Sequence, residues 1–154
     1  MILFYSRSSN PEYFFFSNFY DSPFILNDRK WKTVEHYYQA QKSKDFNIQE
    51  IIRNFEKPGE AARYGRTLPN LRKDWERVKV KYMYNGVYAK FDQNPELLWK
   101  LLKTGDEEIH EDSPKDEIWG WRNNGKDYLG LVIMKVRENL KRKNSNETSM
   151  LEMF

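Results

Sequence analysis

The pattern of hydrophobic and polar positions predicts short strands near the start of the chain. Residues 2–5 form an apolar run typical of a strand. Residues 24–26 and 30–32 flank an Asn-Asp-Arg segment, which is typical of a hairpin. Between them, residues 6–23 combine Ser, Asn and Pro with an aromatic run, and this composition predicts a loop.

Helical spacing and capping residues dominate the rest of the chain. Thr33 is suited to cap a helix over residues 34–45, and Asp74 to cap a long helix over residues 75–91. Further helices are expected over residues 48–55 (closed by Pro58-Gly59), 60–66, 95–102 and 129–142. Residues 106–128 mix polar and turn residues with a few apolar ones, which predicts short strands and a long loop.

These elements predict one helix-rich α+β domain with a small β-sheet, over residues 1–142. Residues 143–154 are mostly polar and are expected to form a fraying C-terminal tail. A chain of 154 residues is long enough for one core without disulfides or metals.

Composition excludes several classes of protein. The chain has no Cys and only two His, which excludes disulfide scaffolds, thiol nucleophiles and zinc fingers. No apolar run reaches the ~18–20 residues of a membrane span, and the first residues lack the pattern of a secretory signal. We therefore expect a cytoplasmic protein that needs no metal and no cofactor and has no membrane partner.

Charge and aromatic content point weakly to an anionic, ring-containing ligand. Lys and Arg total 26 against 23 Asp and Glu, a net charge of +3 that falls short of a duplex-DNA binder. The chain holds 5 Trp, 10 Tyr and 10 Phe. Core packing accounts for most of these rings, but aromatic faces also suit a heterocycle or single-stranded nucleic acid.

The segment from Trp31 to Lys42 carries the densest candidate chemistry. Helical spacing places Glu35, Tyr38, Gln39 and Lys42 on one face. Glu35 falls in the first helical turn, where the helix dipole favours an ionised carboxylate by roughly 0.3–1 kcal/mol. Such a stripe suits the binding and cleavage of a sugar derivative, although the same spacing is also common on a solvated helix face.

Two further clusters are candidates to complete a site. Arg66 and Arg72 lie before Trp75, an arrangement suited to a phosphate beside a stacked ring or, equally, to a solvated basic surface. Residues 111–125 mix carboxylates, two Trp and glycines in a predicted loop, which favours a binding mouth over a merely solvated charge run. No GxGxxG, Walker A, HExxH or GxSxG motif occurs.

Taken in order, several short motifs resemble those of the NADAR (YbiA-like) family. They are Phe16-Ser-Asn-Phe19, Trp31-x-Thr-x-Glu-His-Tyr-x-Gln-Ala-Gln-Lys42, Ala61-Ala-Arg-x-Gly-Arg66, Leu71-Arg-x-x-Trp75, Asp116-x-x-Trp119-Gly120, Asn124-Gly125 and Leu129-Gly130. The resemblance covers about residues 3–142, and the string from Glu35 to Lys42 is its most specific part.

The resemblance implies an N-glycosidase. One branch of the family hydrolyses early riboflavin-pathway intermediates and releases ribose 5-phosphate; another removes ADP-ribose from guanine in nucleic acid. We expect the metabolic branch, and hence a small nucleotide-like substrate, with ADP-ribosylated nucleic acid as the alternative partner. A non-catalytic ADP-ribose-binding module and a single-stranded nucleic-acid binder are the remaining alternatives.

The resemblance also implies a set of site residues. The catalytic candidates are Glu35, Asp116 and Lys42, with Lys42 offering a Schiff-base route. The substrate-binding candidates are Asn18, Phe19, Trp31, Tyr38, Gln39, Arg66, Arg72, Trp75, Trp119, Asn124 and Gly125. Trp121 and Arg122 stand where the family tends to have a small Gly-rich acidic stretch, a departure that bears on substrate identity more than on reaction type.

Overall fold

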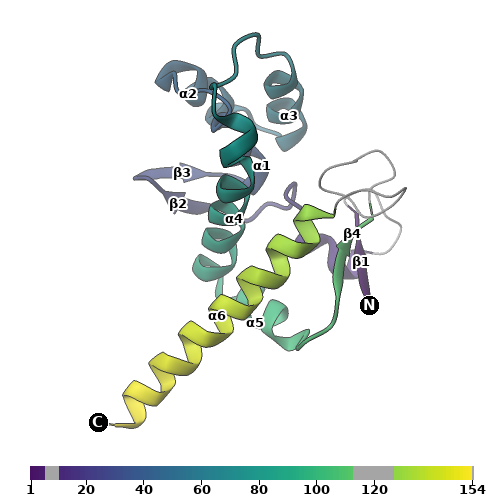
Figure 1. The fold of residues 1–154 in the computed structure, drawn as a ribbon, viewed down its shortest axis with the longest axis vertical. Coiled ribbons are helices and arrows are strands. Elements are labelled where there is room, and N and C mark those ends of the chain that lie inside the picture. Colours follow the sequence, from purple (N-terminus) through teal and green to yellow (C-terminus); the bar gives the residue numbers. More distant parts are fainter. Residues whose placement is uncertain (6–10, 113–126, 154) are drawn as a thin grey trace.

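The structure is a computed structural model that describes residues 1–5, 11–112 and 127–153 (Figure 1). Its elements, in chain order, are β1 (Ile2–Phe4), a 3-10 helix η1 (Pro11–Phe16), β2 (Phe24–Leu26), β3 (Arg29–Trp31), α1 (Val34–Ala40), α2 (Phe46–Asn54), α3 (Pro58–Arg66), α4 (Trp75–Gln93), α5 (Pro95–Lys103), β4 (Ile109–Glu111) and α6 (Tyr128–Glu152). The predicted helix-rich α+β fold is confirmed.

The described strands form two small sheets where the sequence predicts one. β1 pairs with β4 in parallel, and β2 pairs with β3 as an antiparallel hairpin. The hairpin turn contains only Asn27 and Asp28, both with positive φ (55° and 61°), a conformation that these residue types tolerate well. The two-residue turn starts β3 at Arg29, one residue earlier than predicted.

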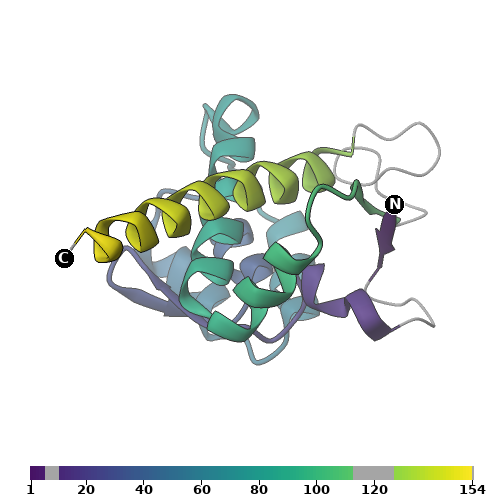
Figure 2. The ribbon, with the colours of Figure 1, turned by 90° about the horizontal axis from the view of Figure 1, so that it is seen from below.

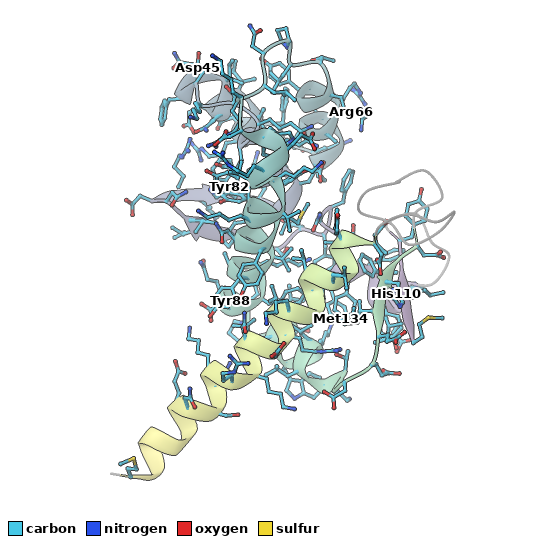
Figure 3. The ribbon with its side chains drawn as sticks, in the orientation of Figure 1. Asp45, Arg66, Tyr82, Tyr88, His110 and Met134 are labelled. Atoms are coloured by element: carbon cyan, nitrogen blue, oxygen red, sulfur yellow. The ribbon has the colours of Figure 1, made fainter. Side chains whose placement is uncertain are left out.

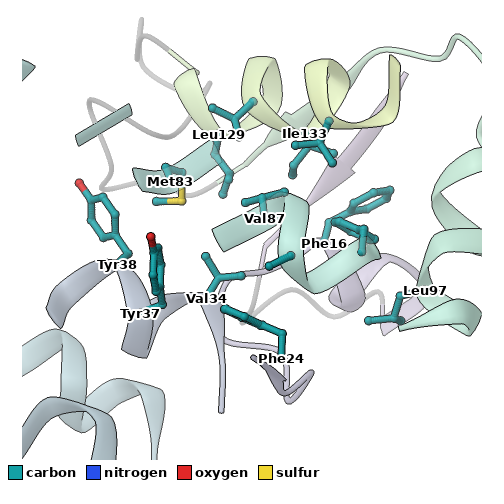
Figure 4. Close-up of a cluster of buried hydrophobic side chains, with 14 of the residues drawn as sticks. Phe16, Phe24, Val34, Tyr37, Tyr38, Met83, Val87, Leu97, Leu129 and Ile133 are labelled. Atoms are coloured by element: carbon teal, nitrogen blue, oxygen red, sulfur yellow. The ribbon is translucent and has the colours of Figure 1, made fainter. Parts of the chain in front are cut away.

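The helices surround one core, with α4 at its centre. α4 packs against α1, α5 and α6, and Figure 2 shows α6 lying along one side of the body over α4 and α5. In Figure 4, Met83 and Val87 of α4 face the buried side of α1, with Leu129 of α6 beyond them. α1 approaches α4 closely at Gly86, where an added Cβ would lie 3.0 Å from the ring of Tyr37.

Several helix boundaries differ from the predicted ones. α1 ends at Ala40 rather than residue 45. Asp45 instead caps α2, because its backbone is extended and its side chain accepts from the Asn47 amide at 2.8 Å. Pro58 opens α3 instead of closing α2, since proline fits the first helical turn.

The final helix also continues beyond its predicted end. α6 reaches Glu152, so the predicted fraying tail is helical over most of its length. Residues 143–152 contain no Gly or Pro, and Lys143 bonds Asp92 of α4 at 2.9 Å. In the part of the chain that the structure describes, no helix is long and apolar enough to span a membrane.

Candidate active site

Glu35 lies in the first turn of α1, which is fixed by hydrogen bonds to the Thr33 side chain and to the backbone of Asn18. The Thr33 hydroxyl accepts from the His36 amide at 3.2 Å and caps α1, as predicted. The Glu35 amide donates to the Asn18 carbonyl at 3.1 Å, so the loop before β2 satisfies another amide of the first turn. The Glu35 side chain is 9% exposed, which places a carboxylate at the edge of the core beside the positive end of the helix dipole.

Gln39 holds this carboxylate from the next turn of α1. Its Nε2 donates to Glu35 Oε1 at 2.7 Å. The Gln39 side chain lies against Gly65 of α3, where an added Cβ would stand 2.0 Å from Gln39 Oε1. Gln39 Oε1 is buried and has no hydrogen-bond partner among the described residues. The absence of a side chain at Gly65 therefore leaves room for the Gln39 amide in the orientation that donates to Glu35.

Lys42 lies near the same carboxylate, one turn beyond Gln39. Burial lowers the pKa of its ammonium, the Arg66 cation lowers that pKa further, and the Glu35 carboxylate opposes both effects. Arg66 is exposed at the end of α3, and Figure 3 shows its side chain on the outer side of that helix. Lys42 is therefore close enough to interact with both the Glu35 carboxylate and the Arg66 cation, and its lowered pKa favours the neutral, nucleophilic amine.

An aromatic pair adjoins the polar stripe. The Tyr38 and Trp75 rings are 5.1 Å apart and inclined at 52°, and both side chains are buried. Figure 4 shows the Tyr38 hydroxyl at the edge of the buried cluster, away from Tyr37. The start of α4 thus supplies a wall next to the stripe formed by α1.

Asn18, in the loop before β2, is hydrogen-bonded to Glu35 through its backbone carbonyl. Its side chain is buried, its Nδ2 donates to Met83 Sδ at 3.3 Å, and its Oδ1 has no hydrogen-bond partner among the described residues. A buried amide oxygen without a partner is costly unless another group satisfies it, so Asn18 Oδ1 is suited to accept a bond from a bound ligand. Phe19, the next residue, is exposed.

Two of the residues suggested by the sequence take other positions. Trp31 is 0% exposed, its Nε1 donates to the Leu26 carbonyl at 3.1 Å, and its ring packs against Tyr37 in the core. The Arg72 guanidinium bonds Asp74 at 2.6 Å and the Tyr82 hydroxyl at 3.0 Å. This pairing lowers the pKa of Asp74 to about 2 and occupies Arg72 within the protein.

Four other candidates, Asp116, Trp119, Asn124 and Gly125, lie outside the described residues. The described residues on either side are joined, since His110 Nδ1 of β4 hydrogen-bonds Asp127 Oδ2 at the start of α6. The same Asp127 accepts from the Glu111 amide through Oδ1 at 3.4 Å. These hydrogen bonds join β4 to the start of α6, on either side of residues 113–126 in the sequence.

The structure also adds buried polar residues that the sequence analysis overlooked. Lys90 is 1% exposed in the core, and the Gln41 Nε2 is buried without a partner among the described residues. The sequence holds a signal for Lys90, which shares a helical face with Met83 and Val87 at spacings of i+7 and i+3. In the described residues no group of three or more His, Asp or Glu side chains is placed to hold a metal ion.

A carboxylate and an amide on α1 and an ammonium just beyond its end, beside an aromatic pair, define a site for a polar, ring-containing substrate. The match to known sequences agrees with this class: the NADAR domain model matches residues 3–141, and the chain belongs to this family.

Relatives and a solved structure extend the match. The chain is 44% identical to N-glycosidase Npun_R5314 of Nostoc punctiforme over 132 residues, which cover 82% of this chain and 85% of the relative. It is 39% identical to riboflavin biosynthesis protein VVA0006 of Vibrio vulnificus over 90% of this chain and 38% of that longer protein. The NMR structure of the Escherichia coli protein YbiA matches with a TM-score of 0.84 and 38% identity, covering 93% of this chain and 87% of that one.

Proposed function

We propose that this chain hydrolyses the C1–N bond of a phosphorylated ribosyl heterocycle, with early riboflavin-biosynthesis intermediates as its substrates. It is an N-glycosidase: relatives that it covers nearly end to end, among them YbiA of Escherichia coli, carry that name. The riboflavin assignment is supported by the name of the Vibrio vulnificus relative. The observation that carries the proposal is the buried Glu35 carboxylate, bonded to Gln39 at 2.7 Å.

Glu35 is the proposed catalytic carboxylate. When the C1–N bond breaks, its electron pair goes to the base nitrogen and positive charge develops at C1 and the ring oxygen. A nearby carboxylate stabilises that charge, or takes a proton from the water whose oxygen forms the new bond to C1. The base nitrogen takes up a proton, so that one water is consumed and ribose 5-phosphate and the free base are released.

Other groups of the site have proposed supporting roles. Gln39 orients the carboxylate, and Arg66, exposed beside Lys42, is placed to bind a phosphate. Lys42 provides a second route for a substrate whose ribose ring opens to an imine between C1 and the base nitrogen. The Lys42 amine adds to C1, the base leaves as the free amine when the lysine Schiff base forms, and one water then releases ribose 5-phosphate and Lys42. Asp116 and Trp119 remain proposed site residues by family resemblance.

A second candidate substrate is ADP-ribosylated guanine in nucleic acid. It is favoured by a hollow at the start of α4, whose lining includes the basic side chains of Lys44, Lys73 and Arg77. Such a hollow suits a phosphodiester backbone. A reader that binds ADP-ribose without cleaving it is a further alternative, and it predicts binding without product. A cytoplasmic location also remains a prediction.

A product assay separates these substrates. Wild type, Glu35→Gln and Glu96→Gln are each given a phosphorylated ribosylaminopyrimidine and an ADP-ribosylated guanine oligonucleotide, and the products are identified by mass spectrometry. Glu96 is a matched control, because it is an exposed carboxylate in the first turn of α5.

We expect ribose 5-phosphate from the first substrate, a loss of about 10²–10⁴ in rate for Glu35→Gln, and wild-type rates for Glu96→Gln. Free ADP-ribose and restored guanine would move the enzyme to the second substrate. Near wild-type turnover by Glu35→Gln would overturn the assignment of Glu35.

A further inference from the structure

Lys90 is an ionisable side chain in the core of the protein. It lies on α4 with 1% of its surface exposed, and its Nζ donates to the Ser17 carbonyl at 2.9 Å. The ammonium also lies 5.1 Å from the centre of the Phe91 ring and 5.8 Å from that of Tyr20. No described carboxylate lies within ion-pair distance of it, and burial lowers the pKa of the ammonium to about 7. Burying a lysine without a charged partner costs stability.

The carbonyl that Lys90 holds belongs to the turn in front of the site. The Ser17 carbonyl also accepts from the Tyr20 amide at 3.1 Å, which closes the turn. The next carbonyl, that of Asn18, accepts from the Glu35 amide at 3.1 Å. The bond to Lys90 and the bond that fixes the start of α1 are therefore accepted by two consecutive backbone carbonyls.

α4 holds this turn at a second point on the same helical face. Met83 Sδ accepts from Asn18 Nδ2 at 3.3 Å, and Met83 precedes Lys90 by two helical turns. Between them, Gly86 allows α1 to approach, since an added Cβ there would lie 3.2 Å from Val34. The turn and the start of α1 thus both contact the same face of α4.

We propose that Lys90 is a positioning residue for the Glu35 site: its buried ammonium fixes the Ser17 carbonyl, and through the Ser17–Asn18 turn it sets the position of the first turn of α1. The proposal rests on the proposed catalytic role of Glu35. Without the ammonium, the Ser17 carbonyl keeps only the Tyr20 amide and the turn can shift toward solvent. A displacement of about 1 Å at a reacting group is enough to lower a rate by about 100-fold.

The test compares Lys90→Met, which keeps an unbranched side chain one atom shorter and removes the donor, with two other variants. Lys90→Gln retains an N–H donor without the charge. Val87→Ala shortens a buried neighbour on the same helix that makes no hydrogen bond to the turn, and it controls for a loss of core packing. Each is measured for kcat, KM, melting temperature and hydrogen exchange of the Glu35 amide.

We expect Lys90→Met to fold with a melting temperature close to that of wild type, because a buried ammonium is replaced by an apolar group. Its kcat should fall by about 10- to 100-fold with KM within about twofold, and the Glu35 amide should exchange faster. Lys90→Gln should recover part of kcat and of the protection. Val87→Ala should melt earlier but keep kcat and the Glu35 protection.

A Lys90→Met variant with wild-type kcat and wild-type exchange at Glu35 would overturn the proposal. Combining Lys90→Met with Glu35→Gln separates it from a failure of the catalytic assignment. If Glu35→Gln alone lowers kcat as expected and leaves a measurable rate, the positioning role predicts no further loss in the double variant, and additive losses would refute it. If Glu35→Gln alone is active, the catalytic assignment fails and the Lys90 proposal fails with it. Should Lys90→Met not fold, Lys90→Gln carries the same test.

Discussion

Replacing Gly65 by Ala tests how the neighbouring helix sets the geometry of the carboxylate. The new Cβ would lie 2.0 Å from Gln39 Oε1 and 2.8 Å from Gln39 Cδ, well inside van der Waals contact. Gln39 is buried on α1, so relief requires its amide to turn and to give up its 2.7 Å bond to Glu35. We therefore expect the substitution to act on catalysis through a side chain that it does not change.

The magnitudes follow from the contacts. Overpacking costs about 1–3 kcal/mol, and the better helix propensity of Ala returns up to ~1 kcal/mol, which leaves a net destabilisation of about 0–2 kcal/mol. A hydrogen bond to a charged group contributes about 1.5–3 kcal/mol. If that bond is made in the transition state, its loss lowers kcat by about 10- to 100-fold.

Gly59→Ala is the matched control, because Gly59 lies in the same helix and an added Cβ there meets nothing within 4 Å. Release of ribose 5-phosphate gives kcat, and urea unfolding gives the free energy of unfolding. A Gly65→Ala kcat within about twofold of that of Gly59→Ala would refute the reasoning. The same holds if Gly65→Ala costs as much activity in a Gln39→Ala background, where the clash is absent.

Two further predictions concern stability. Both ring nitrogens of His36 are bonded, to the Thr33 hydroxyl at 2.8 Å and the Phe55 carbonyl at 2.9 Å, and burial lowers its pKa. Because the folded state resists protonation of His36, the contribution of His36 to stability is complete above its ordinary pKa of 6.5 and is lost as the pH falls toward the folded pKa. Urea unfolding should therefore give a lower free energy of unfolding at pH 5 than at pH 7.5, and His36→Gln should reduce that difference. An unchanged difference in this variant would contradict the prediction. Arg72→Ala should lower the melting temperature by about 3–6 °C through loss of the bonds to Asp74 and Tyr82. Arg66→Ala should leave the melting temperature unchanged and raise KM. The reverse pattern would restore Arg72 as the phosphate ligand.

Local features of the fold were predictable from the sequence because they depend on neighbouring residues. Thr33 caps α1 as predicted, and the Asn27-Asp28 pair makes the hairpin turn. Asp74 precedes α4 as predicted, yet its side chain makes no capping bond because its carboxylate bonds Arg72. A side chain suited to two partners takes the stronger one, and sequence spacing alone does not rank them.

Contacts between distant segments were not predictable from spacing or composition. The parallel pairing of β1 with β4 joins Ile2 to Ile109, and nothing local to either strand indicates it. Trp31 shows the same limit within the site, because a Trp in a functional motif has the same sequence pattern whether it packs a core or contacts a ligand. Its 0% exposure follows from the packing of the hairpin against Tyr37.

The helix that carries the proposed chemistry is held at three points by three separate segments. The Asn18 carbonyl accepts from the Glu35 amide at the start of α1, and the Gln39 side chain, near the end of α1, packs against Gly65 of α3. Just beyond its end, the Arg72 amide donates to the Lys42 carbonyl at 2.8 Å. α1 itself is only seven residues long, too short to hold its shape alone. The precision of the Glu35 stripe therefore comes from these outside contacts, which is why substitutions at Lys90 and Gly65, neither of them a proposed substrate contact, are expected to reduce kcat more than stability.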